Sequence, residues 1–182
     1  LRSNEDYIYK HSLNTAILCA LISSRLGLEF KSQLDIVAAA LLHDVGKIGI
    51  PEYILNKAER LTDEEYEMIK GHVEASIDII RHLPSLDYVI PAVIGHHEHY
   101  DGKGYPRRIA GEDIPLTARI LCVADSFDAM TSIRCYKKAF PVKVAREKLI
   151  QDAGKQFDPE LVRKFVECLD NGTINLVKAE EA

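Results

Sequence analysis

The chain has 182 residues, of which 47% are hydrophobic and 28% charged, values that fit one globular domain with a sizeable core. Its formal net charge of -5 argues against binding of nucleic acid polymers, which usually requires a basic face. No apolar run approaches the ~20 residues needed to cross a membrane, so no membrane insertion is expected in this segment.

The N-terminus, Leu-Arg-Ser-Asn-Glu-Asp, has neither a signal-peptide pattern nor a starting Met. We expect residues 1–182 to form a single domain that is a fragment of a longer chain, whose missing part is regulatory. The first predicted helix ends near Gly27 and has one face made of Leu13, Ile17, Leu21 and Ser24.

The middle of the chain predicts mostly helices. Residues 35–42, rich in Ala, indicate a buried helix, and residues 47–55 are expected to contribute a short extended piece. The capping box from Thr62 to Glu65 opens a helix whose apolar face continues to Ile80, and residues 87–97 repeat the helical pattern.

The second half begins with a loop over residues 99–115 that is rich in Gly and Pro. Loops of this length in a compact domain are usually functional. Helices are predicted over residues 115–130 and 141–153, and a last one starts at the cap formed by Asp158 and Pro159. The pattern favours an all-helical domain.

The four cysteines are too widely spaced for a zinc or redox motif. Cys19 and Cys122 lie in apolar stretches, which predicts buried thiols. A reducing cytoplasm is the compartment expected from this cysteine usage.

The strongest chemical signal is the pair His43 and Asp44, which directly follows the apolar run of residues 38–42. Burying a carboxylate without a partner costs several kcal/mol, so Asp44 calls for a compensating cation, and a metal ion is the natural candidate. Lys47, three residues later, lies on the same face if the helical turn continues.

Further imidazoles and a second carboxylate lie on or beside apolar helical faces. One such histidine is more often a core residue than a ligand, but their joint placement favours a metal site. For Asp125 the alternative is an N-cap or a buried ion pair with an arginine such as Arg119. The candidate ligands are His11, His43, Asp44, His72, His96, His97 and Asp125.

Imidazoles and carboxylates without thiolates suit iron, manganese, zinc or cobalt in an open catalytic site. Five histidines and two aspartates are too many for one ion, so we expect two ions that share Asp44. Two metals about 3.5–4 Å apart can hold a hydroxide between them and clamp a phosphoryl group for in-line displacement. These residues therefore predict a phosphate-ester hydrolase.

An ordered series of motifs resembles the HD-GYP subfamily of the HD metal-dependent phosphohydrolases, over roughly residues 7–165. The resemblance implies an all-α bundle of about six to eight helices with a long Gly/Pro-rich loop. It also implies a cytoplasmic signalling phosphodiesterase that opens cyclic di-GMP to pGpG, and further to GMP, by attack of a metal-bridging hydroxide. The matching stretches are residues 43–51, 96–106, 114–120, 123–130 and 154–159.

The resemblance also assigns ligands. One ion is held by His11, His43, Asp44 and Asp125, and the second by Asp44, His72, His96 and His97. Iron or manganese is expected, with zinc, cobalt or nickel as alternatives. A third ion in some family members uses a Glu where this chain has Tyr7, which favours two ions.

The same resemblance assigns substrate contacts. Lys47 corresponds to a phosphate ligand or proton donor beside the metals, and Arg134 and Lys137 to phosphate contacts. These are local cations of the kind that an acidic protein needs for an anionic substrate. Tyr105 either stacks on a guanine or pins the loop.

Two roles are open for the acidic residues of the loop. Glu98 and Asp101 either orient the metal-bound histidines or cap the loop. Asp128 is expected to be a helix or network residue rather than a ligand. One departure from the family pattern, Arg107-Arg108-Ile109 after Pro106, bears on the loop's conformation and on signalling partners that it binds.

Two other functions remain open at this level. The metal ligands do not determine which nucleobase the substrate carries, so another cyclic dinucleotide or phosphate ester is an alternative substrate. A non-catalytic sensor or docking module, with a structural metal site and a partner bound at Tyr105, is the alternative from a different class.

Overall fold

The computed structural model describes residues 4–132 and 139–171, with side chains from residue 9 onward. Arg134, Cys135 and Lys137 and the side chain of Tyr7 lie outside these residues. The described ranges form α-helices and short 3-10 helices, with one isolated bridge between Ala153 and Phe157 and no strand. The all-α prediction is confirmed.

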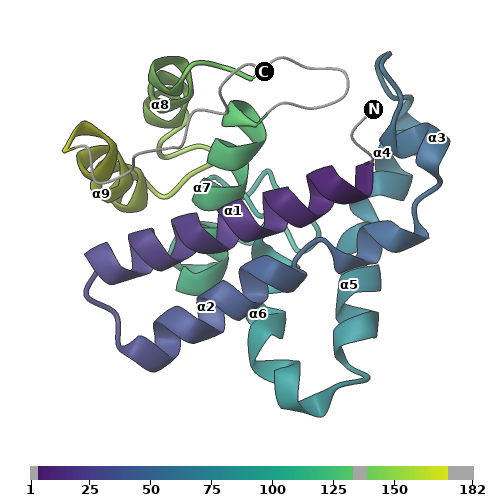
Figure 1. Cartoon of the computed structure of the whole chain (residues 1–182), viewed down its shortest axis with the longest axis horizontal. Helices are drawn as coiled ribbons and strands as arrows, with labels where there is room; N and C mark the ends of the chain where they lie inside the picture. Colours follow the sequence, from purple (N-terminus) through teal and green to yellow (C-terminus); the bar gives the residue numbers. More distant parts are fainter. Residues whose placement is uncertain (1–3, 133–138, 172–182) are drawn as a thin grey trace.

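Helices α1 (Asn4–Arg25) and α2 (Phe30–Leu42) form an antiparallel pair that runs across the molecule (Figure 1). The predicted face of α1 is wrong, because Leu13 and Ile17 are 42% and 60% exposed. The buried side of α1 instead mixes small apolar and polar residues, including Thr15, Cys19 and Ser23. Hydrophobicity alone therefore did not identify the face that packs.

After α2 the chain passes through His43 and Asp44 into the 3-10 helix η1 (Val45–Gly49), and then into α3 (Glu52–Leu55). The extended piece predicted for residues 47–55 is therefore wrong. The turn is closed by backbone hydrogen bonds from Lys47 to Asp44 and from Ile50 to Lys47, and the Gly46 amide ties it to α5 through a hydrogen bond of 2.8 Å to Ser76 Oγ. Only Ile50 and Pro51 have extended backbone between the two helices.

The capping box is present at the start of α4 (Asp63–Lys70). The single helix predicted to reach Ile80 is divided at Gly71, after which α5 (His72–Ile80) begins with a histidine. The segment 87–97 is likewise divided, into the 3-10 helix η2 (Pro84–Val89) and α6 (Ile90–Gly95).

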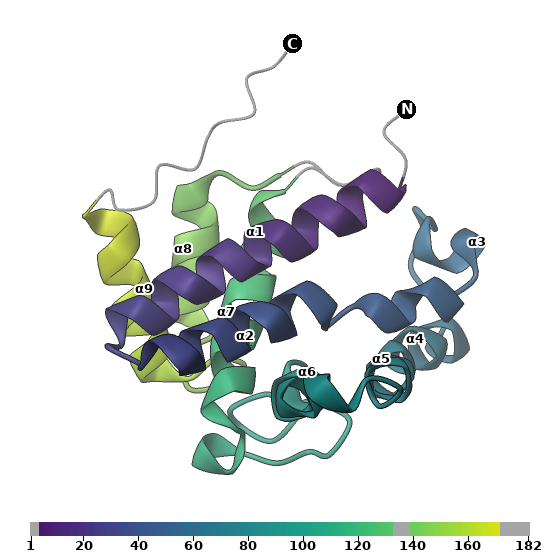
Figure 2. The same ribbon diagram turned by 60° about the horizontal axis from the view of Figure 1, so that its bottom comes forward.

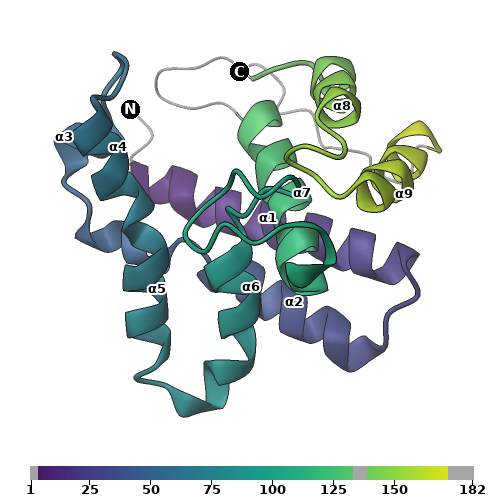
Figure 3. The ribbon, with the colours of Figure 1, turned by 180° about the vertical axis from the view of Figure 1, so that it is seen from behind.

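The long loop, which contains the 3-10 turn η3 (Gly111–Asp113), leads to α7 (Leu116–Thr131) and then to α8 (Val142–Gln151) and α9 (Pro159–Asp170). Asp158 caps α9 as predicted, because its carboxylate accepts hydrogen bonds from the amides of Glu160 and Leu161. Seen from behind, α7 lies near the centre, with the loop in teal beside it (Figure 3).

The core surrounds α7 and joins all the long helices. Phe127 of α7 and Phe165 of α9 pack edge to face with ring centroids 4.9 Å apart. Ile22 of α1 and Ile36 of α2 are fully buried on the other side. Cys19 and Cys122 are buried free thiols, as predicted. In Figure 2, α2 lies between α1 above it and α5 and α6 below it.

Among the described residues, no helix has both the length and the apolar character needed to cross a membrane.

Candidate metal centre

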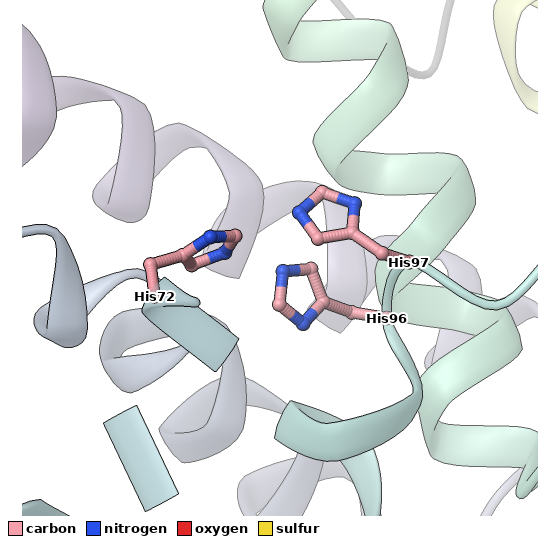
Figure 4. A group of neighbouring side chains, drawn as sticks. All are labelled: His72, His96 and His97. Carbon is pink, nitrogen blue, oxygen red and sulfur yellow. The ribbon is translucent and has the colours of Figure 1, made fainter. Parts of the chain in front are cut away.

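The seven candidate ligands, which come from five regions of the chain, meet where α1, α2, α5, α6 and α7 approach one another. Their potential ligand atoms form three overlapping groups, and within each group all atoms lie within 4.8 Å of one another. Figure 4 shows the first group, in which His72 faces His96 and His97 across a small space. The groups are His72, His96 and His97; His11, His43 and Asp125; and His43, Asp44 and His96.

Three of the rings are held by the backbone of helix ends. His43 Nδ1 lies 2.7 Å from the carbonyl oxygen of Ala40. His72 Nδ1 lies 2.6 Å from that of Ile69, and His96 Nδ1 lies 2.6 Å from that of Val93. A carbonyl only accepts hydrogen bonds, so Nδ1 carries the proton in each ring. In the neutral form of each ring, Nε2 is then left with a lone pair.

These lone pairs converge in a buried space. Nε2 of His43, His72 and His96 and Oδ1 of Asp44 are buried without a hydrogen-bond partner. His72 Nε2 lies only 3.3 Å from Asp44 Oδ1, although both atoms are acceptors in this tautomer. Each unsatisfied buried group costs about 1–3 kcal/mol. A cation among them would remove that cost, so the residues fit a divalent metal.

The protonation states also suit a cation. Burial lowers the pKa of His72 and His96, and it lowers that of His97 to about 3, so these rings are neutral. Burial by itself would raise the pKa of Asp44, but His43 and Lys47 hold it well below its ordinary value. Ionised carboxylates and neutral imidazoles are the forms that bind metals.

Asp125 lies in the cluster of candidate ligands, and it has neither of the two structural roles considered for it, an N-cap or an ion pair with Arg119. It lies in the interior of α7, so it is no N-cap, and Arg119 pairs with Asp158 at 2.5 Å instead. Burial opposes the ionised form of Asp125, but the hydrogen bond with His11, at 3.0 Å, together with the charges of His11 and His43, lowers the pKa of the carboxyl.

Lys47 lies where the spacing predicted. Its Nζ atom is 2.5 Å from Asp44 Oδ2, and the side chain is a quarter exposed, so it reaches the centre from the solvent side. This places one cation beside the Asp44 carboxylate. Arg134 and Lys137 lie outside the described residues.

The loop after α6 folds back onto the centre. The Tyr105 ring stacks on His97, with centroids 4.8 Å apart and planes inclined by 27°. Glu98 is a loop anchor, because its carboxylate accepts hydrogen bonds from the amides of Arg107 (2.6 Å) and Arg108 (3.1 Å). Asp101 accepts one from the Lys103 amide, at 3.1 Å, and also belongs to the loop.

Asp128 is a network residue, as expected, but the sequence did not show what it contacts. Its carboxylate lies 2.6 Å from His11 Nδ1 and accepts hydrogen bonds from Asn14 and Ser132, both at 2.9 Å. The spacing of three residues from Asp125 puts both carboxylates on one side of α7, which indicates that Asp128 lies near the cluster but does not name its partner.

Comparisons with known proteins agree with this geometry. The chain is similar to the 3'3'-cGAMP-specific phosphodiesterase 2 of Vibrio cholerae, with 38% identity over 165 residues that cover 88% of this chain and 31% of that protein. It is equally similar to a cyclic di-GMP phosphodiesterase of Thermotoga maritima, with 38% identity over 160 residues that cover 87% of this chain and 44% of that protein. The chain thus spans less than half the length of these relatives.

The fold also has solved counterparts. The structure of an HDG"Y"P protein from Bdellovibrio bacteriovorus superposes with a TM-score of 0.74 at 20% identity, covering 92% of this chain and 54% of that one. A family model described as an HD domain matches residues 1–161. As the HD-GYP motifs predicted, the chain belongs to the HD domain family.

Proposed function

We propose that this domain is a binuclear metal-dependent phosphodiesterase that cleaves a cyclic dinucleotide, with cyclic di-GMP as the first candidate substrate. The observation that carries the proposal is the position of Asp44. Its Oδ2 atom lies 3.3 Å from His43 Nε2 and 3.7 Å from His11 Nε2, whereas its Oδ1 atom lies 3.3 Å from His72 Nε2. One carboxylate therefore faces two sets of imidazoles, as a shared ligand must.

These neighbours support the ligand assignment that the family resemblance implies. His11, His43, Asp44 and Asp125 would hold one ion, and Asp44, His72, His96 and His97 the other. When bound, two such ions polarise a phosphoryl oxygen and make water a better nucleophile. We favour iron or manganese, with zinc, cobalt or nickel as alternatives, and two ions because Tyr7 replaces the carboxylate of a third site.

The remaining roles belong to side chains around the ligands. The Lys47 ammonium beside Asp44 would bind a substrate phosphate or give a proton to the leaving oxygen. Tyr105 would offer its ring to a guanine, and Arg134 and Lys137 would contact phosphates. We place the domain in the cytoplasm, where the loop that carries Tyr105 would also meet signalling partners.

The direct test is hydrolysis of cyclic di-GMP by the iron- or manganese-loaded protein, prepared without oxygen, with products separated by chromatography. We expect pGpG, and competition with 3'3'-cGAMP would rank the two substrates that the relatives' names suggest. If fully metallated protein leaves every cyclic dinucleotide intact, the proposal fails. Tight binding without turnover would favour the sensor module instead.

A second test concerns Tyr105. We expect Tyr105→Ala to raise KM about tenfold, since stacking on a base contributes about 1–3 kcal/mol. Tyr105→Phe keeps a ring that can stack on His97 and serves as the matched control. KM and kcat of both variants decide the matter: if Phe is as damaging as Ala, the hydroxyl rather than the ring is what the reaction uses.

A further inference from the structure

Asp128 contacts the metal centre from behind, through the side of His11 that faces away from Asp44. We propose that Asp128 is a positioning residue that fixes the orientation and tautomer of His11 and strengthens its Nε2 as a metal ligand. The inference rests on the part of the proposed function that places an ion at His11, but not on the identity of the substrate.

The first argument is the position of the His11 ring between two carboxylates of one helix. His11 Nε2 is 3.0 Å from Asp125 Oδ1, and His11 Nδ1 is 2.6 Å from Asp128 Oδ2. A carboxylate accepts hydrogen bonds, so Nδ1 donates to Asp128 and keeps its proton when a cation occupies Nε2. The ring is thereby aimed at Asp125 and Asp44.

The second argument is the contrast with the other rings. His43, His72 and His96 use carbonyls of the last turns of α2, α4 and α6, which lack the full set of intrahelical partners. His11 lies inside α1, where the carbonyls behind it accept amides of the next turn. A side chain from another helix must replace the missing acceptor, and a carboxylate binds Nδ1–H more strongly than a carbonyl.

The third argument is that Asp128 is itself held in place. The residue is 3% exposed, and its Oδ1 atom accepts hydrogen bonds from Asn14 Nδ2 and Ser132 Oγ, which leaves Oδ2 for His11. No lysine or arginine within 4–132 or 139–171 forms an ion pair with Asp128, whose ion pair there is with His11. A buried carboxylate arranged in this way raises the basicity of a ligand histidine.

The test is metal affinity, measured by competition of Mn²⁺ or Zn²⁺ with a chromophoric chelator. Asp128→Asn preserves the shape of the side chain. We expect it to lower the affinity for one of the two ions about 10–100-fold and to leave the affinity for the other unchanged. Asn14→Ala is the matched control: it removes a donor to the same carboxylate but keeps the contact with His11, so both ions should bind within about threefold of wild type.

A spectroscopic signature separates positioning from a merely structural role. In ¹⁵N-labelled, Zn²⁺-loaded protein, one ring N–H bonded to a carboxylate should resonate apart from those bonded to carbonyls, and Asp128→Asn should shift only that signal. The wild-type spectrum remains decisive even if the variant does not fold. Ring N–H signals that are alike for His11, His43, His72 and His96 would overturn the proposal. Folded Asp128→Asn that binds both ions like wild type would overturn it as well. If the wild type binds no metal, the proposed function falls with it.

Discussion

Asp44→Ala should abolish turnover and release metal from both halves of the centre. Both carboxylate oxygens face imidazoles of different groups, so no other single side chain in the cluster can replace this ligand. Loss of about 4 kcal/mol of metal-derived stabilisation corresponds to a rate lower by a factor of about 1,000. Metal content by elemental analysis and kcat on the same preparation measure the two effects.

Asp158→Ala is the matched control for loss of a buried carboxylate. Asp158 is 6% exposed, caps α9 and pairs with Arg119, away from the metal ligands. Its removal should cost about 1 kcal/mol of stability through the lost cap, and more because Arg119 loses its partner, while metal content stays at the wild-type level. An Asp44→Ala protein that keeps its metal and full activity would contradict the shared role of this carboxylate.

Gly46→Ala should have a large effect for a change of one methyl group. A Cβ atom at this position would lie 2.2 Å from the His72 carbonyl oxygen and 2.4 Å from the Ser76 amide nitrogen. These are backbone atoms of α5, so η1 and α5 must separate, at a cost of about 2–3 kcal/mol or more. The separation would move Lys47 and Asp44 away from His72 and weaken metal binding.

Gly49→Ala in the same 3-10 helix provides the comparison, because a Cβ there meets no atom within 4 Å. We expect the melting temperature of Gly46→Ala to fall by about 5–10 °C and that of Gly49→Ala to change by less than about 2 °C. Thermal unfolding and metal titration of both variants decide. Equal behaviour of the two proteins would show that the contact of η1 with α5 is not needed.

Much of the chemistry could be predicted from residue types and short-range pattern. The pair His43–Asp44 after an apolar helix predicted a buried cation site, and the caps at Thr62 and Asp158 marked helix starts that the structure confirms. These features depend on interactions within one helical turn, which local sequence specifies. The ligand roles of the cluster remain predictions until metal is measured.

Contacts between distant segments were decided only by the tertiary structure. Packing buried a face of α1 that mixes polar residues such as Thr15 with apolar ones such as Ile22. It also wound residues 45–49 into a 3-10 turn against Ser76 and paired Arg119 with Asp158 rather than with Asp125. It also brought Asp128 to His11 across 117 positions of sequence. No local periodicity encodes such a pairing, because it depends on how whole helices cross in the core.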